Sequence, residues 1–282
     1  MSRSLLRRIA GGAPAVLLAA AATLYVLPLV WMVLTSFRGP EEIFGWTASP
    51  WPAQWRWANY AEVWHRSRLF PMMVNSVAVA GAVVAGQVVT SAIAGYSLAR
   101  LPGRSGRILM AVFVASLLVP DQLTWIPSFW LLEKAGLIDT RGALIVPFLA
   151  GAMAVLIMRQ QFLSVPRELE EAAMLDGCGP WALLRHVLLP AVTPGLRAVA
   201  VITFLFSWGD LLWPLLMTHR AEVRTLPVGL AFLQDELSGQ WHLLLAGSVI
   251  AAVPALWAVG ALTARFAHVD ENTSTQGQEA TS

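Results

Sequence analysis

The sequence predicts an all-α, polytopic membrane protein with six transmembrane helices and a polar helical elbow between the fourth and the fifth. With 57% hydrophobic and 13% charged residues, the chain is too apolar for an ordinary soluble domain. Six long stretches are nearly free of charge, and each reaches or approaches the roughly 20 residues that a helix needs to cross the hydrocarbon. They must be helices, because an open backbone cannot be satisfied in lipid. They lie at 13–36, 70–99, 108–130, 142–160, 195–217 and 241–264.

The first stretch follows a basic amino terminus that holds Arg3, Arg7 and Arg8. No charge then appears before Arg38. A cleaved signal peptide has an apolar core of only about 7–15 residues. We therefore expect a retained first span.

The loop at 38–68 is rich in tryptophan, which concentrates at membrane interfaces. We expect an interfacial belt or interfacial helix there, with sugar stacking as the alternative. The tryptophans are Trp46, Trp51, Trp55, Trp57 and Trp64.

The second stretch carries small residues that allow neighbouring helix backbones to approach closely. We therefore expect this span to pack inside the bundle. The residues are Gly81, Gly86, Ser91 and Gly95.

The elbow covers 166–190 and is bounded by prolines. Pro166 can occupy the first helical position, where its missing N–H costs nothing. Gly177 is a natural left-handed stop, Pro180 can open a second short helix, and Pro190 can end it. Acidic residues fall in or near the first turn, where the helix dipole favours them: Glu168, Glu170 and Glu171.

Six spans place both termini on one side of the membrane. Lys and Arg number 11 on the side of the termini and the elbow, against 8 in the three opposite loops. The positive-inside tendency therefore predicts that the termini and the elbow are cytoplasmic.

The chain carries no recognisable enzyme or metal motif. It has no glycine-rich phosphate loop and no nucleophile motif, and its five histidines lack metal-ligand spacing. Its one cysteine, Cys178, cannot form an internal disulfide and is interpreted as a small packed residue. A formal net charge of +2 does not argue for nucleic acid. We expect no catalytic or metal site and no cofactor in this chain.

Glu171-Ala172-Ala173, Asp176-Gly177 and Leu189-Pro190 resemble the EAA loop of binding-protein-dependent ABC importer permeases. The resemblance covers roughly 14–266 and is closest to the carbohydrate-uptake permeases, the family of the second membrane subunit of the maltose transporter. Further matching segments are Asn75-Ser76, 96–100, Pro120 with Gln122, Gly136-Leu137, Arg159-Gln160, 208–214 and 225–230.

This resemblance implies a permease subunit of an ATP-driven importer for a sugar or oligosaccharide in the bacterial plasma (inner) membrane. The implied partners are a second permease subunit, a dimer of ATP-binding subunits that holds ATP and Mg, and an extracytoplasmic solute-binding protein. The seven EAA-loop residues quoted above would couple to the ATPase. One alternative changes the cargo to glycerol phosphate or another polar solute. Another is an ion-coupled secondary transporter, which requires paired intramembrane charges and inverted repeats with broken helices.

Four residues are candidates for the substrate path: Asp210, Trp208, Gln122 and Asn75. Asp210 lies roughly 22 Å into the fifth stretch, counted from Gly195, and Pro214 should bend or end the helix near it. We interpret Asp210 and Trp208 as cavity-lining and Trp213 as interfacial. The alternatives are that Asp210 and Asp121 lie near the outer headgroups, or that Asp210 pairs with an outer-loop arginine.

The domain organisation follows from these spans. Residues 1–268 form one permease domain that contains the coupling loop at 166–190. The tail at 269–282 is polar, lacks the glycine-rich, lysine-containing ending of similar permeases, and is expected to be disordered and cytoplasmic.

Overall fold

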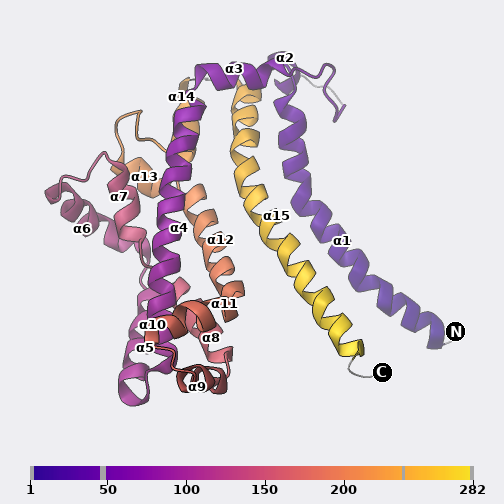
Figure 1. The fold of residues 1–282 in the computed structure, drawn as a ribbon. Coiled ribbons are helices and arrows are strands. Elements are labelled where there is room, and N and C mark those ends of the chain that lie inside the picture. The colour runs from indigo at the N-terminus through magenta and orange to yellow at the C-terminus, as the bar shows by residue number, and fades with distance from the viewer. Residues whose placement is uncertain (1–2, 45–48, 237–238, 280–282) are drawn as a thin grey trace. The chain divides into compact units, whose positions relative to one another are not determined.

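The computed structural model describes residues 3–44, 49–236 and 239–279, with side chains over 16–43, 49–234 and 239–261. Within these ranges every regular element is helical (Figure 1). The chain forms two compact units, Met1–Leu69 with Leu230–Ala252, and Phe70–Gly229 with Val253–Ser282. The all-α prediction is confirmed.

The first unit begins with α1 (Arg3–Ser36), an uninterrupted helix. Its segment Val16–Ser36 is long and apolar enough to cross a membrane, and its most apolar 18-residue stretch has no buried residue. The first predicted span is therefore a continuous helix whose apolar side chains are exposed on all sides. Such a helix needs lipid or another protein to cover it.

The loop after α1 folds back on the end of that helix. The Phe37 ring lies 5.1 Å from Trp55 and 4.7 Å from Trp57, measured between ring centroids. The Asn59 amide donates to the carbonyl oxygen of Ser36 at 2.8 Å, which satisfies one of the carbonyls that a helix end leaves free. The loop is thus tied to the end of the span.

Two short helices interrupt this loop, α2 (Pro40–Phe44) and α3 (Ala58–Arg66). α3 has one buried face, with Val63 fully enclosed, and an exposed polar face. A helix is therefore present where we expected an interfacial one, and its place at the membrane surface stays a prediction. Trp46 lies outside the described residues.

In the second unit the long helix is α4 (Leu69–Arg100), as predicted for the second stretch. A Cβ added at Gly95 would meet Met158 Cβ at 2.7 Å, and one added at Gly86 would meet Leu149 Cδ2 at 2.5 Å. Small residues therefore allow close packing at these two positions. At Gly81 a Cβ would meet no atom of the described residues within 4 Å, so no close contact among them requires that glycine.

Three of the predicted spans are bent pairs of helices, not single rods. α5 (Gly103–Leu117) and α6 (Asp121–Lys134) meet at 94°, so the single helix expected over 108–130 is wrong. Pro120 is the physical reason, because it has a fixed φ and no N–H. Counting each bent pair as one span gives up to six candidate spans.

Of the other two bent pairs, one precedes the elbow and the other includes the second arm of the elbow. The fourth span combines α7 (Arg141–Ile145), the short 3₁₀ turn η1 (Val146–Phe148) and, at 41°, α8 (Ala152–Ser164). In the later pair, Pro180–Ala191 meets α12 (Thr193–Gly209) at 75°. The fifth predicted span, 195–217, consists of α12 and α13 (Leu212–Met217).

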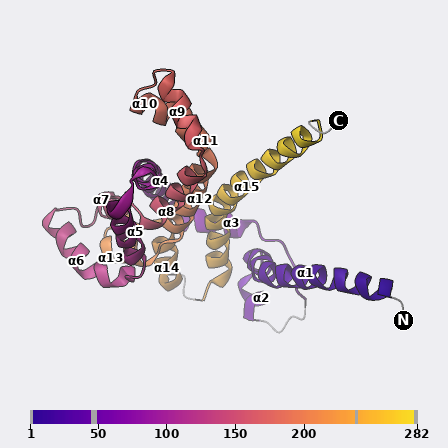
Figure 2. The same cartoon turned by 90° about the horizontal axis from the view of Figure 1, so that it is seen from below.

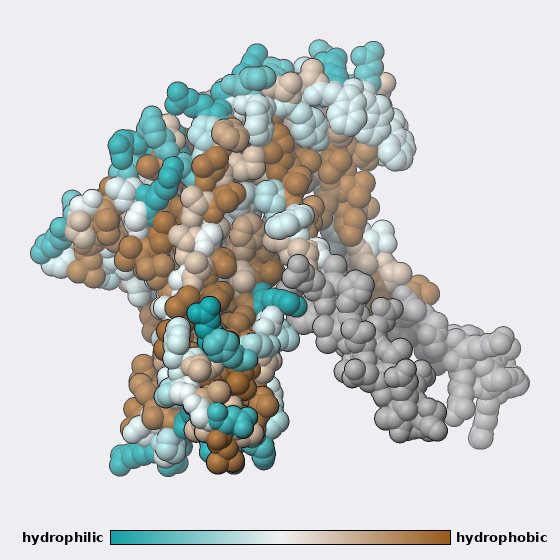
Figure 3. Space-filling view, in the orientation of Figure 1, coloured by the Kyte–Doolittle hydropathy of each residue, from teal (hydrophilic) through white to brown (hydrophobic). Residues whose placement is uncertain are grey.

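Two apolar clusters hold the second unit together, one along each half of α4. Figure 3 shows that much of the surface around α4 is apolar. The elbow-end cluster includes Met158, Phe162, Leu183, Leu188 and Val199. The other includes Val83, Leu132, Leu144, Trp213 and Met217.

The chain ends with α14 (Leu226–Glu236) and α15 (Trp241–Glu279), which both run through the unit boundaries. The sixth predicted span, 241–264, falls within α15. The backbone of α15 is helical as far as Glu279, beyond residue 268, where we placed the end of the permease domain. Disorder of the tail stays a prediction.

Candidate functional site

The elbow consists of two short arms joined by a tight turn, as predicted (Figure 2). The first arm begins directly after Pro166 and ends at Asp176. The second arm begins with proline at its first helical position, where no N–H is required. The first arm is α9 (Arg167–Leu175), and the second consists of α10 (Pro180–Ala182), the π-helix η2 (Leu183–Leu188) and α11 (Leu189–Ala191).

Gly177 makes the turn with a φ of +84°. The N–H of Gly177 donates to Met174 O, and the N–H of Cys178 donates to Ala173 O, both at 3.0 Å. These two bonds form a Schellman motif, which satisfies the last carbonyls of α9. Ala173 and Cys178, its usual apolar pair, both belong to the elbow-end cluster, so Cys178 is a packed residue as expected.

α9 has a buried face and an exposed face. Glu170 and Ala173, three residues apart, are 5% and 8% exposed. Glu171 and Ala172 point to the outside, as does the Asp176 side chain at the helix end. The EAA segment therefore presents one carboxylate and one methyl group outward and uses its second alanine for packing.

The outer surface of the elbow carries large apolar side chains. Leu175 is 89% exposed and Trp181 68% exposed, on the two sides of the Gly177 turn. Met174 and Leu169 are also exposed. An apolar patch of this kind on a polar, protruding element is typical of a protein-binding surface.

The second arm is anchored by Leu183 and Leu188, which are buried in the elbow-end cluster. Leu189 is half-buried against the same cluster, and Pro190 is exposed. Pro190 cannot donate to the carbonyl of His186, and its ring crowds that carbonyl, which explains the wider π-helical turn that precedes it.

Glu170 is bound by Arg100, the last residue of α4. Arg100 Nε donates to Glu170 Oε1 at 2.7 Å, and Nη2 contacts the same oxygen. Nη2 also lies 3.4 Å from the carbonyl oxygen of Val165, at the end of α8. Sequence reasoning placed Glu170 among the first-turn acids and missed this partner. The available signal was its three-residue spacing from Ala173, which puts both on one face.

At the candidate substrate path, α12 ends at Gly209, so the predicted break near Asp210 is confirmed. Asp210 Oδ1 accepts the N–H of Trp213 at 3.4 Å, which caps the start of α13. Trp208 is 5% exposed and stacks on Phe204 with ring centroids 5.4 Å apart.

Trp213 does not fit its predicted interfacial place. It is 4% exposed, and its indole N–H donates to Ala143 O at 3.0 Å. Its ring also makes an edge contact with Phe148 at 5.6 Å. A buried partner for the N–H allows the whole side chain to enter the core.

The other two path candidates lie in different surroundings. Asn75 is buried, and its amide donates to the carbonyls of Glu222 and Arg224 at 2.8 and 2.9 Å. Its Oδ1 accepts Arg141 Nε at 3.0 Å. Asn75 therefore braces a loop. Gln122 is exposed in the first turn of α6.

The Trp125 ring, one helical turn after Asp121 in α6, makes an edge contact with the Trp213 ring at 6.5 Å between centroids. The structure thus brings the first turn of α6 near the break at Asp210. Whether these four residues line a path stays a prediction.

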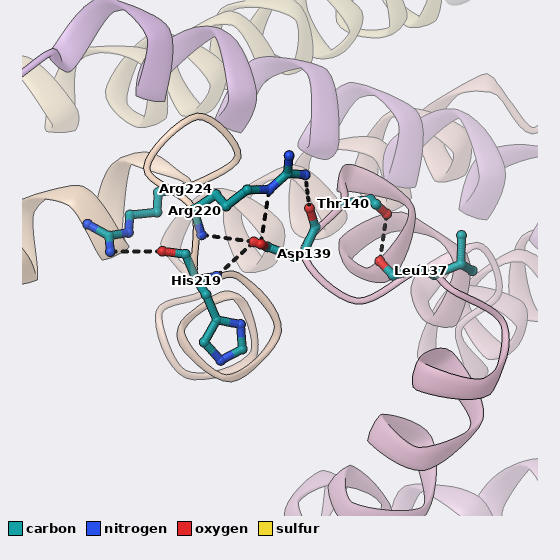
Figure 4. Close-up of polar contacts among 6 residues, drawn as sticks. All are labelled: Leu137, Asp139, Thr140, His219, Arg220 and Arg224. Carbon is teal, nitrogen blue, oxygen red and sulfur yellow. Dashed lines mark hydrogen bonds and ion pairs between the residues drawn. The ribbon is translucent and has the colours of Figure 1, made fainter.

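A polar clamp lies at the end of the second unit opposite to the elbow (Figure 4). Asp139 Oδ1 accepts the backbone N–H groups of His219 and Arg220 at 2.8 and 2.9 Å. These bonds hold the pKa of the Asp139 carboxyl below its usual value, and the bond from the Arg220 N–H has the largest effect. Arg224 Nη2 donates to His219 O at 3.0 Å within the same loop. The clamp ties the 218–225 loop to the α6–α7 turn.

The family model described as "Binding-protein-dependent transport system inner membrane component" matches residues 69–269. The chain belongs to this family. It is therefore a multi-pass membrane permease subunit, and the resemblance based on the EAA loop is confirmed.

Similar curated proteins agree. The chain is 32% identical over 232 residues to the arabinooligosaccharides transport system permease protein AraQ of Halalkalibacterium halodurans, covering 81% of this chain and 83% of that one. It is 34% identical over 192 residues to the sn-glycerol-3-phosphate transport system permease protein UgpE of Agrobacterium fabrum, covering 67% of each.

A solved structure of a bacterial ABC transporter involved in the import of the acidic polysaccharide alginate has the same fold. Its TM-score is 0.81 at 19% identity, over 94% of this chain and 99% of that one.

Proposed function

We propose that this permease imports a sugar or oligosaccharide and is driven by a separate ATPase that binds the elbow. The observation that carries this proposal is the outer surface of the elbow, where the exposed Glu171 shares α9 with exposed apolar side chains next to the Gly177 turn. Such a helical surface fits a groove in a partner, with apolar anchors and a charged group that fixes its orientation.

The cargo class is supported by relatives. AraQ and the diacetylchitobiose uptake system permease protein NgcG of Streptomyces coelicolor, 33% identical over 212 residues, are both named for oligosaccharide uptake. UgpE, at 34% identity, makes glycerol phosphate the second candidate. Asp210 and Gln122, near the break between α12 and α13, offer hydrogen-bonding groups for hydroxyls, and Trp208 offers an aromatic face.

The complete importer would contain a second permease subunit, two ATP-binding subunits and an extracytoplasmic solute-binding protein. ATP and Mg would bind to the ATPase. A solved complex of the alginate transporter with its periplasmic protein shows this type of partner for another importer of the same fold. The elbow and both termini would face the cytoplasm, in keeping with the distribution of arginines.

Copurification of the chain with its ATPase and second permease, followed by reconstitution in liposomes, tests the proposal. Oligosaccharides delivered by the binding protein should stimulate ATP hydrolysis and enter the vesicles. Stimulation by glycerol 3-phosphate alone would select the second candidate. A complex that hydrolyses ATP at one rate with every solute, and takes up none, would contradict the proposal.

A further inference from the structure

The buried contact between Arg100 and Glu170 joins two parts of the molecule that the proposed function requires to move together. Glu170 lies in the first turn of α9 with its side chain buried, whereas the side chain of the next residue, Glu171, is exposed. Arg100 is the final residue of α4, a candidate span of 32 residues. Their side chains are 7% and 16% exposed, so the pair is largely enclosed in protein.

Stability alone is a weak reason for such a pair. Removing two charges from water costs about as much as their attraction returns, so a well-packed apolar pair would stabilise the fold at least as well. What a buried pair provides is resistance to separation, because pulling it apart leaves two charges without partners in an apolar surrounding. The pair therefore acts as a link that holds position.

The link has a third point of attachment. Arg100 Nη2 lies 3.4 Å from the carbonyl oxygen of Val165, the residue that ends α8. A guanidinium at a helix carboxyl end interacts favourably with the free carbonyls there. One arginine thus holds the end of the second span, the end of the fourth span and the first arm of the elbow.

Close packing extends this connection into the membrane. At Gly95, five residues before Arg100, an added Cβ would meet Met158 Cβ at 2.7 Å and the Arg159 nitrogen at 2.8 Å. α4 and α8 therefore touch almost backbone to backbone just inside the ion pair. Displacing α9 would displace both helices as one body.

We propose that the Arg100–Glu170 pair is a positioning link that transmits movement of the ATPase-bound elbow to the second and fourth spans. The proposal rests on the proposed function, because it requires an ATPase on the elbow. It adds that Glu170, whose side chain is buried within this chain, is needed for coupling and not for docking.

The test uses the whole importer in proteoliposomes, with four variants: Glu170→Gln, Arg100→Gln, the double neutral variant, and Glu168→Gln as the matched control. Glu168 is an exposed glutamate on the same helix. Three quantities are measured: the ATPase copurified per permease, transport per assembled complex, and the melting temperature of the complex in detergent.

Each single neutral variant should retain the ATPase and lose at least tenfold in transport per assembled complex. The double variant should lose no more than the worse single one, because residues that act as one unit are non-additive. Glu168→Gln should match the wild type. The link would be overturned if the single variants transported at the wild-type rate per assembled complex and only their melting temperature fell. It would also be overturned if the transport losses of the two single variants multiplied in the double variant.

If a single variant fails to assemble, the double neutral variant is used to decide, because it leaves no unpaired charge buried. Assembly with lost transport supports the link, and assembly with wild-type transport contradicts it. Failure of the proposed function is distinguishable, since it would appear in the wild-type complex as an absence of copurified ATPase or of transport.

Discussion

Arg220 binds both the carboxylate and the main-chain carbonyl of Asp139: Nε lies 3.0 Å from Oδ2, and Nη2 lies 2.8 Å from the carbonyl oxygen. Asp139 itself has a φ of +63°, a conformation that aspartate tolerates better than most residues. The contacts hold the 218–225 loop against the α6–α7 turn, and they make that attachment dependent on the charge of one carboxylate.

Acid should therefore release this loop. Because the folded-state pKa of Asp139 is depressed, its contribution to stability is complete above the ordinary aspartate value of about 4 and is lost as pH falls through the lower folded value. Pepsin cleavage of detergent-solubilised protein within 218–225 should increase over that range. Asp139→Asn should be cleaved at the same relative rate throughout, and an equal pH dependence in this variant would show that another group titrates.

Glu171→Lys should insert normally in the membrane but abolish uptake and weaken ATPase copurification, because it reverses the charge on the exposed face of α9. Glu133→Lys, an equally exposed change on α6, is the control and should leave ATPase copurification unchanged. Wild-type uptake by the Glu171 variant in a complementation assay would remove this residue from the coupling site.

Gly177 should tolerate asparagine better than alanine, and alanine better than valine. No atom lies within 4 Å of a Cβ at this position, so the cost comes from the left-handed backbone alone, about 1–2 kcal/mol for alanine and more for a β-branched residue. Solute-stimulated ATP hydrolysis should fall in that order. Full stimulation in Gly177→Val would mean that the turn is not required.

Gly95→Ala should lower the melting temperature of the purified protein, because its Cβ would press on the α8 backbone. Overpacking of this kind costs about 1–3 kcal/mol. Gly81→Ala on the same helix meets open space and should be neutral or slightly stabilising. Equal melting temperatures for the two variants would contradict the close approach of α4 and α8.

Asp210→Asn should retain part of the uptake, since an amide oxygen still accepts the Trp213 N–H and a solute hydroxyl, whereas Asp210→Ala should lose both contacts. The comparison is made by uptake in proteoliposomes. Equal uptake by Asp210→Ala and Asp210→Asn would show that the Asp210 acceptor does not contact the solute. A solute-bound structure in which neither Asp210 nor Trp208 faces the solute would also contradict their place in the path.

The elbow could be predicted because its determinants are local. Gly177 and Pro180 act through their own backbone preferences and lie where we expected them, whereas Pro166 precedes the first helical position by one residue, as the N-cap of α9. The same rule applied to Pro120 would have predicted the bend between α5 and α6, but apolar content alone joined the two helices into one span.

The surroundings that could not be predicted, those of Trp213 and Glu170, depend on partners that lie far away in the sequence. Trp213 is drawn into the core by a carbonyl 70 residues before it, and Glu170 is buried by an arginine at the same separation. Composition and spacing describe how amphipathic and charged residues usually behave, and they cannot reveal such a partner. The apolar contacts of Trp208 with Phe204, one helical turn apart, are the kind that spacing does reveal.

The π-helical turn at Leu183–Leu188 leaves the elbow with one residue more than a regular helix over the same path would need. A single deletion within this turn, combined with Pro190→Ala to remove the proline that widens it, should therefore convert it to an α-helix and keep the flanking segments in register, whereas a single deletion in α12 would rotate everything beyond it by about 100°. Among related chains, this turn is accordingly where a one-residue gap can be inherited without redirecting the elbow.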